Sequence, residues 1–481
     1  MMPGRRTARG VILVLGLALQ ACFDDDATPT PDAPPRDAPA IVQPAFCADS
    51  EPGAPSADIA AALRRVPGIA DVVEIPASEG DRFFTLTFRQ LVDHSEVGGP
   101  TFKQRVTVIH HGAAAPVILG TQGYDLAQTS FREEPTVILG ANQVEVEHRY
   151  FLPSQPSPVD WSKLTIWQAA ADDHCLIRAL DRIYPSVWIG TGQSKGGMAA
   201  LFHRRFFPDD TIATIAYVTP LSLGAPDPRY VAAVESGTHP ECRQRLRDFQ
   251  RLALSMRSSV ENRMGTLSSV TFDTLGVDVA FEHLVLELPF GFWQYDDVSS
   301  CNNVPGAGAT SDAVFAYLDQ VGQVSLYGDA LVAHYAPYYV QAATQLGYPE
   351  IDESNLAAML QHPGTDTPIP YLPEGASSEF DPTAMDDIRN WVQTAGSRLL
   401  FIYGQNDPWS GGMIQLGAAT DSFRLIVAEG NHDSLIADLS TDDQKKALDA
   451  IRRWAKLPAK ASMLVPAPRE RYHAQRHAAY P

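Results

Sequence analysis

The chain has 481 residues, 45% hydrophobic and 9% aromatic, which is enough to bury a large core and excludes a fibrous or disordered protein. It carries 37 basic against 57 acidic residues, a formal charge of −20. Because phosphate binding needs a basic face, this balance argues against a nucleic-acid partner.

Residues 1–21 are typical of a secretion signal. Arg5, Arg6 and Arg9 precede the apolar run VILVLGLAL, which is too short to span a bilayer. The following LQAC resembles a bacterial lipoprotein processing box, in which Cys22 becomes the acylated N-terminus. An ordinary signal peptide cleaved nearby is the alternative. We therefore expect an exported protein of the cell envelope, attached to the membrane only through this lipid.

Residues 22–46 are rich in proline and acid, which favours an extended tether. Four further cysteines, an even number in an exported protein, predict two disulfides with three possible pairings. We favour Cys242–Cys301, because both cysteines lie in the middle third of the chain, and hence Cys47–Cys175. No two cysteines have the spacing of zinc ligands, and no motif requires a metal or an organic cofactor.

Strands alternate with helices from about residue 80. Strands are expected at 82–91, 102–111, 115–120, 142–151, 186–190, 211–220, 398–404 and 423–430, and helices at 162–184, 198–207 and 440–454. Residues 223–392 break this rhythm, being largely helical and rich in turns. The pattern predicts an α/β fold in which a core of residues 47–222 and 393–465 is interrupted by a helical cap and followed by a flexible basic tail, 466–481.

Small residues surround Ser194 at the point where a predicted strand passes into a helix. The pentapeptide Gly192-Gln193-Ser194-Lys195-Gly196 matches the G-x-S-x-G nucleophile elbow, whose strained serine needs tiny neighbours. We predict that Ser194 is a nucleophile and that the backbone N–H of Lys195 binds the substrate oxygen, with the lysine side chain pointing elsewhere. The alternative is a glycine-rich turn with an ordinary N-cap serine.

A serine hydroxyl needs a base, and the base needs an orienting acid. Asp407 and His432 follow the last two predicted strands, so the chain order is serine, acid, histidine. Alone, each is an ordinary loop residue, in an Asp-Pro turn or on the surface; together, at successive strand ends, they predict a catalytic triad. Asp433 and Asp438 are weaker candidates because they follow the histidine.

A second donor to the substrate oxygen is expected from the loop after the third strand. Two stretches compete: IHHGAAAP, after the second predicted strand, and ILGTQGYDL, after the third. We favour the backbone of Gly123 or Tyr124 in the latter. His110 and His111 face opposite sides of one strand, which favours a structural role over metal ligation.

Several stretches, taken in order, resemble one family. They are FRQLVDHSEVGGPTFKQRVTVIHHG, VEHRYF, GTGQSKGGMAALFHRRFFPDD, AYVTP, FGFWQY and YGQNDPW…NHD, within roughly residues 80–455. They resemble the exported bacterial serine peptidases typified by secreted tripeptidyl and prolyl-type aminopeptidases (peptidase family S37), related to the prolyl carboxypeptidase and dipeptidyl peptidase group. The resemblance implies an α/β-hydrolase fold with a large, mostly helical cap, and a triad of Ser194, Asp407 and His432.

The resemblance also implies a serine peptidase that releases di- or tripeptides from substrates with a free N-terminus. A free α-amino group calls for a buried carboxylate, and Glu147 and Glu287 are candidates because each lies beside aromatic residues. The alternative for both is a salt bridge, for Glu147 with Arg149 or Arg204.

Trp293 and Tyr295 are candidates to line the cleft, with a place in the cap core as the alternative. Since the same triad hydrolyses esters, an esterase or lipase is the alternative activity. A non-catalytic cell-surface binding protein is the third possibility, and an intact triad argues against it.

Overall fold

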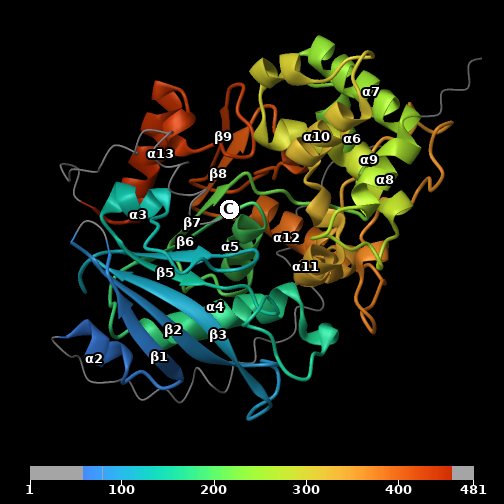
Figure 1. Ribbon diagram of the computed structural model, residues 1–481. Coiled ribbons are helices and arrows are strands. Elements are labelled where there is room, and N and C mark those ends of the chain that lie inside the picture. Colours follow the sequence, from blue (N-terminus) through green and yellow to red (C-terminus); the bar gives the residue numbers. More distant parts are fainter. Residues whose placement is uncertain (1–57, 78–79, 458–481) are drawn as a thin grey trace, which may run out of the picture. The chain divides into compact units, whose positions relative to one another are not determined.

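The computed structural model describes residues 58–77 and 80–457. The predicted signal peptide, tether and basic tail, with Cys22 and Cys47, lie outside the described residues. The strands are β1 (Ile69–Ile75), β2 (Arg82–Leu91), β3 (Thr101–His110), β4 (Val117–Thr121), β5 (Asn142–Val146), β6 (Trp188–Gln193), β7 (Ala213–Tyr217), β8 (Leu399–Gly404) and β9 (Phe423–Val427) (Figure 1).

These strands form a 9-stranded sheet in the order β1-β2-β3-β5-β4-β6-β7-β8-β9. The first three pairings in this order are antiparallel, and all pairings from β5 to β9 are parallel. The carboxyl ends of β4, β6, β8 and β9 therefore share one edge of the sheet, where ligands bind in open α/β sheets. The loops that leave this edge carry Gly123, Ser194, Asp407 and His432.

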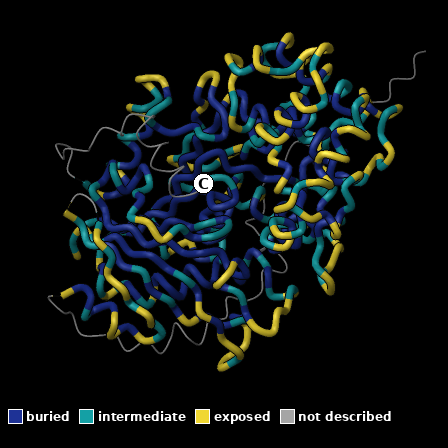
Figure 2. The backbone as a smooth tube through the Cα atoms, in the orientation of Figure 1, coloured by how far each residue is buried: buried dark blue, intermediate teal, exposed yellow. Residues whose placement is uncertain are grey.

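Helices cover both faces of the sheet. They are α2 (Ile59–Leu63), α3 (Glu134–Leu139), α4 (Ile166–Leu180), α5 (Lys195–Phe206), α12 (Pro382–Ala395) and α13 (Thr441–Trp454). Side chains of β4 alternate between the two faces: Leu119 packs in one cluster with α4, and Ile118 packs in another with α3 and α13. The central strands are buried on both sides (Figure 2), which explains their continuous apolar runs.

The chain leaves the sheet after β7 and returns at β8, its hydrogen-bonded neighbour. The intervening cap contains α6 (Arg229–Glu235), α7 (Pro240–Ser255), α8 (Arg257–Gly265), α9 (Val277–Tyr295), α10 (Ser311–Gly322) and α11 (Asp329–Gln341). Phe249 of α7, Phe281 of α9 and Leu318 of α10 belong to one hydrophobic cluster. The cap thus has a core of its own. None of the helices in the described part of the chain is long and apolar enough to cross a bilayer.

Three local features differ from the sequence-based expectations. Strand β1 was not expected, because its side chains are mostly exposed and show no clean alternation. The expected strand 142–151 ends at Val146, after which the chain turns into the site. The expected cap boundary at residue 392 falls inside α12, whose Ile388 and Val392 pack in one cluster with Phe401 of β8; this helix belongs with the core.

Candidate active site

Ser194 lies in a strained turn between β6 and α5. Its φ of 54° and ψ of −126° are unfavourable for a residue with a side chain, and its N–H donates to the Tyr217 carbonyl at 2.9 Å. A Cβ on Gly192 would lie 2.4 Å from the Gly196 carbonyl oxygen, and one on Gly197 would lie 1.9 Å from Thr219 Oγ1. Only glycine fits at either position. The flanking glycines therefore let the strand and helix close around a partly accessible serine.

Asp407 and His432 form a buried pair. The Nδ1 atom of His432 lies 2.8 Å from Oδ2 of Asp407. Asp407 also accepts the Trp409 N–H at 3.0 Å and begins the short helix η6 (Pro408–Gly412). Burial raises the pKa of Asp407, an effect that the neighbouring His432 ring opposes. The Asp407 carboxylate thus holds the His432 ring with Nδ1 toward it and Nε2 on the opposite side.

The other ring nitrogen of His432 is directed away from Asp407. This Nε2 atom is buried and has no hydrogen-bond partner among the residues that the structure describes. The Gln193 side chain, next to Ser194, donates to the His432 carbonyl at 2.7 Å, which holds the histidine loop against the elbow. Nε2 is therefore available to take the Ser194 proton, the role that the triad requires.

The loop after β4 lies against the elbow. A Cβ on Gly123 would come within 2.8 Å of the Gly196 nitrogen, so only glycine permits this approach. The backbone N–H groups of Gly123, Tyr124 and Lys195 have no acceptor among the hydrogen bonds of residues 80–457. Two of them, one from each segment, would suffice to bind an oxyanion.

The position of Lys195 beside the serine led us to expect that its side chain points away from the site. That prediction was wrong. Lys195 Nζ donates to the Gly123 carbonyl at 2.7 Å and lies 5.4 Å from the Tyr124 ring centre and 5.7 Å from that of Phe151. The side chain is buried, and burial holds the pKa of Lys195 well below its usual value. The Lys195 side chain therefore links the elbow to the loop after β4, which contains Gly123 and Tyr124 and is called the oxyanion loop below. This contact is additional to the backbone N–H that Lys195 offers.

The carboxylate of Glu147 is occupied by partners within the protein. Arg105 donates to its Oε1 from Nε at 3.0 Å and also from an NH2 group, and Ser154 donates to Oε2 at 2.5 Å. The Leu126 N–H adds a further bond at 3.0 Å. Glu147 is thus a buried structural ion pair, as the alternative interpretation held, but its partner is Arg105 rather than Arg149 or Arg204. Arg149 instead binds Asp172.

Glu287, on α9, is the remaining carboxylate candidate. It accepts hydrogen bonds from the hydroxyls of Tyr327 at 2.7 Å and Tyr348 at 3.2 Å, and no described cation forms an ion pair with it. Burial raises its pKa. Its carboxyl lies against that of Asp366, a residue that the sequence did not single out because only the folded cap brings the two together.

The two aromatic candidates differ in position. Trp293 is fully buried in the cap core, where it stacks on His239 and packs under Arg243, so it does not line a cleft. Tyr295 is 55% exposed, and its ring centre lies 6.2 Å from that of His432. The ring centre of Trp409, two residues after Asp407, also lies 6.2 Å from that of His432. The sequence Asp407-Pro408-Trp409 could have suggested this residue as a neighbour of the site.

The cap holds the histidine loop directly. The His432 N–H donates to the Gln294 carbonyl at 3.0 Å, and the Asn431 side chain donates to the Tyr295 carbonyl at 3.0 Å. Both acceptors lie at the end of α9. The position of His432, the predicted base, therefore depends on the cap as well as on the sheet.

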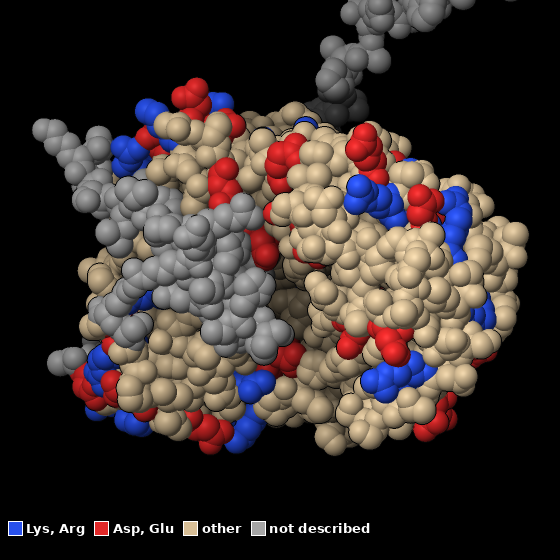
Figure 3. Space-filling model, turned by 45° about the horizontal axis from the view of Figure 1, so that its top comes forward, with Lys and Arg blue, Asp and Glu red and all other residues tan. Residues whose placement is uncertain are grey.

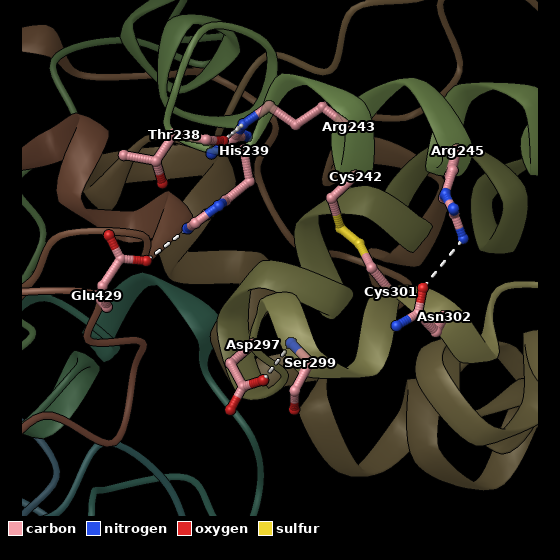
Figure 4. Close-up of a disulfide and its surroundings, with 10 residues drawn as sticks. All are labelled: Thr238, His239, Cys242, Arg243, Arg245, Asp297, Ser299, Cys301, Asn302 and Glu429. Atoms are coloured by element: carbon pink, nitrogen blue, oxygen red, sulfur yellow. Dashed lines mark hydrogen bonds and ion pairs between the residues drawn. A yellow bond between two sulfur atoms is a disulfide. The ribbon is translucent and has the colours of Figure 1, made fainter.

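A second part of the cap reaches the same loops (Figure 4). His239 pairs with Glu429 at 2.5 Å, and Thr238 donates to Asn406, the neighbour of Asp407. The disulfide Cys242–Cys301, with Cα atoms 5.6 Å apart, joins α7 to the segment that follows α9. Cys175 is also disulfide-bonded, and Cys47, its expected partner, lies outside the described residues.

His110 and His111 make structural contacts. His110 Nδ1 lies 3.2 Å from the Tyr184 hydroxyl, and His111 Nδ1 lies 2.9 Å from Asp81. Their loop follows β3, and the loop with Gly123 follows β4, because the unexpected β1 shifts the strand count by one.

Comparison with known proteins assigns the family. The model of the PS-10 peptidase S37 family matches residues 50–473. The chain belongs to this family. It is 40% identical over 410 residues to a prolyl tri/tetrapeptidyl aminopeptidase of Streptomyces mobaraensis, covering 84% of this chain and 86% of the relative. The chain is therefore a serine peptidase with an α/β-hydrolase fold, as the sequence stretches indicated.

Two more distant similarities were also found. A lysosomal Pro-X carboxypeptidase of Mus musculus is 26% identical over 423 residues, which cover 73% of this chain and 83% of the relative. Among solved structures, the peroxisomal α/β-hydrolase Lpx1 of Saccharomyces cerevisiae covers 83% of this chain and 96% of its own, with 10% identity and a TM-score of 0.34.

Proposed function

We propose that this peptidase removes a short peptide from substrates with a free N-terminus, and that Glu287 receives the terminal ammonium. The observation that carries the proposal is a carboxylate inside the cap with no cationic partner among the described residues. A buried carboxylate needs such a partner, and an incoming ammonium supplies one. Acidic side chains also border the hollow on the face drawn in Figure 3, where they would attract a cation.

The proposed chemistry uses the three residues at the sheet edge. Ser194 Oγ attacks the scissile carbonyl while His432 Nε2 takes its proton, and the N–H groups of Lys195 and of Gly123 or Tyr124 bind the developing oxyanion. His432 then donates this proton to the leaving amine. Water hydrolyses the acyl-enzyme by the same sequence, with His432 again as base.

The tyrosines of α11 separate the ammonium site from the oxyanion loop. Tyr338 lies 6.0 Å from Tyr124 and 5.2 Å from Tyr339, centre to centre, and Tyr339 interacts with Glu287. The name of the Streptomyces relative, a prolyl tri/tetrapeptidyl aminopeptidase, supports the release of three or four residues and suggests proline before the cleaved bond.

A mixture of diverse peptides tests the activity. Each peptide is present in equal amounts with a free and with an acetylated N-terminus, and a Ser194→Ala variant is the control. Products identified by mass spectrometry should be short N-terminal fragments, from free-amine peptides only. Equal cleavage of acetylated peptides would mean an endopeptidase and would refute the ammonium site. Hydrolysis of simple esters without peptide cleavage would establish the alternative esterase.

We further propose that the protein is exported and anchored in the cell envelope through lipidated Cys22. The support is the sequence VILVLGLALQAC alone, because this segment lies outside the described residues. Expression in a bacterium with labelled fatty acid should label the full chain but not a Cys22→Ala variant. A full-length protein that carries no fatty-acid label and stays in the soluble fraction would contradict the proposed lipid anchor.

A further inference from the structure

Two carboxyl groups meet inside the cap. Asp366, in the segment between α11 and α12, is 8% exposed, and its carboxyl lies against that of Glu287. Neither oxygen of Asp366 receives a hydrogen bond from any described residue. Glu287 uses one oxygen for Tyr327 and the other for Tyr348. Among the described residues, the polar partner of Asp366 is therefore the Glu287 carboxyl itself.

Two adjacent buried carboxyls cannot both ionise without a cation. Burial raises the pKa of Asp366 well above its usual value, and the Glu287 charge raises it further. The other ionisable groups around the pair are Tyr327, Tyr338, Tyr339, Tyr348, Tyr371 and the carboxylate of Glu353, none of which is cationic. His283, one turn before Glu287 on α9, contacts the Tyr371 and Thr365 hydroxyls, and burial lowers its pKa to about 4, so it supplies no charge at neutral pH. The pair therefore retains one proton in the free enzyme.

Glu287 and two neighbouring tyrosines keep some exposed surface. Glu287 is only half-buried although it lies deep in the cap, and Tyr338 and Tyr339, which lead from the oxyanion loop toward it, are half-buried as well. Their rings lie on the path that the substrate peptide would follow from Tyr124. These contacts connect Tyr124, through Tyr338 and Tyr339, with Glu287 and Asp366.

We propose that Glu287 and Asp366 together bind the N-terminal ammonium of the substrate, which displaces the proton that the two carboxyls share. This inference rests on the proposed aminopeptidase activity. The displaced proton passes to solvent, the ammonium keeps its own protons, and both carboxylates accept hydrogen bonds from it. The O–H bond of the shared proton breaks and one forms on water or buffer; no other covalent bond changes. Peptide binding is then coupled to proton release, and an N-acetylated peptide has no charge with which to displace the proton.

Calorimetry measures this coupling. A peptide cleaved by the enzyme is titrated into the full-length Ser194→Ala protein at one pH, in two buffers of different ionisation enthalpy. We expect the release of about one proton per bound peptide. Adding Asp366→Asn should weaken binding roughly 10- to 100-fold, the usual cost of losing a charged hydrogen-bond partner, and reduce proton release. Glu353→Gln, which alters a nearby carboxylate outside the pair, is the matched control and should leave both nearly unchanged.

Kinetics on the Ser194 enzyme completes the test. Asp366→Asn should raise KM for free-amine peptides and leave labelling of Ser194 by a fluorophosphonate at the rate of the parent, which shows that the variant is folded. Parent-like affinity and proton release in Asp366→Asn would overturn the inference. If the parent distinguishes free from acetylated peptides and Asp366→Asn distinguishes them equally well, only the role of Asp366 fails. If the parent itself does not distinguish them, the proposed function fails.

Discussion

The His432 ring and the Asp407 carboxylate are joined inside the protein by a hydrogen bond of 2.8 Å, between Nδ1 and Oδ2. In Asp407→Asn the amide group can donate to Nδ1 and so hold the wrong tautomer, with Nε2 protonated. We expect kcat to fall roughly 10⁴-fold, as for the loss of this acid in other serine peptidases, with KM little changed. Steady-state kinetics and circular dichroism check activity and fold. Asp433→Asn, one residue beyond the histidine, is the control and should retain activity; an equal loss there would contradict the assignment.

Lys195 tests how the oxyanion loop is held. Lys195→Met keeps the backbone N–H and the length of the side chain but removes the bond to the Gly123 carbonyl. Because misplacing a reacting group by about 1 Å costs on the order of 100-fold, we expect kcat to fall by about this factor while KM stays near the parent value. Thermal stability should not fall in parallel, since a buried lysine without a carboxylate is itself costly. A lower melting temperature with unchanged kcat would assign Lys195 to stability alone.

The disulfide Cys242–Cys301 closes a loop of 59 residues within the cap. In the chain-entropy account, such a cross-link stabilises the folded state by about 4 kcal/mol. The double variant Cys242→Ala/Cys301→Ala should lose about this free energy of unfolding, measured by denaturant titration. Activity should decline before global unfolding, because α7 and the end of α9 both hold the loops of Asp407 and His432. Coincident loss of activity and structure would show that the cap does not loosen separately.

Asp210 gives a pH-dependent prediction far from the catalytic residues. Burial alone would raise the pKa of this carboxyl, but hydrogen bonds from His174 and His203 outweigh it and lower the pKa to about 2. The folded-state pKa is thus below the unfolded value, so the stabilisation is complete above about pH 4 and is lost as the pH falls through 2. Asp210→Asn should cost about 2 kcal/mol at pH 7, a difference that shrinks below pH 4. Urea unfolding at several pH values measures it. Asp209→Asn, the exposed neighbour, should show no such difference.

The sequence predicted those parts of the site that depend on local order. Ser194 was recognisable because the glycines around it are required by the turn itself, and Asp407 and His432 because they follow successive parallel strands. The carboxylates were not recognisable in this way. Glu147 and Glu287 both lie beside aromatic residues in the sequence, and only tertiary contacts distinguish them: Arg105 neutralises Glu147, whereas Glu287 meets Asp366. Asp366 itself lies in a segment without regular periodicity, so its partner could not be inferred.

The backbone carbonyls at the end of α9 hold the loop of His432. The predicted catalytic loops of the sheet and the cap, which we propose selects the peptide, are therefore mechanically one unit. A foreign cap grafted between β7 and β8 would enter and leave the sheet at adjacent strands without disturbing the ladder, but it would leave the histidine loop unsupported unless it supplied equivalent acceptors. In this architecture, new specificity is more readily reached by changing residues inside the existing cap than by exchanging it whole.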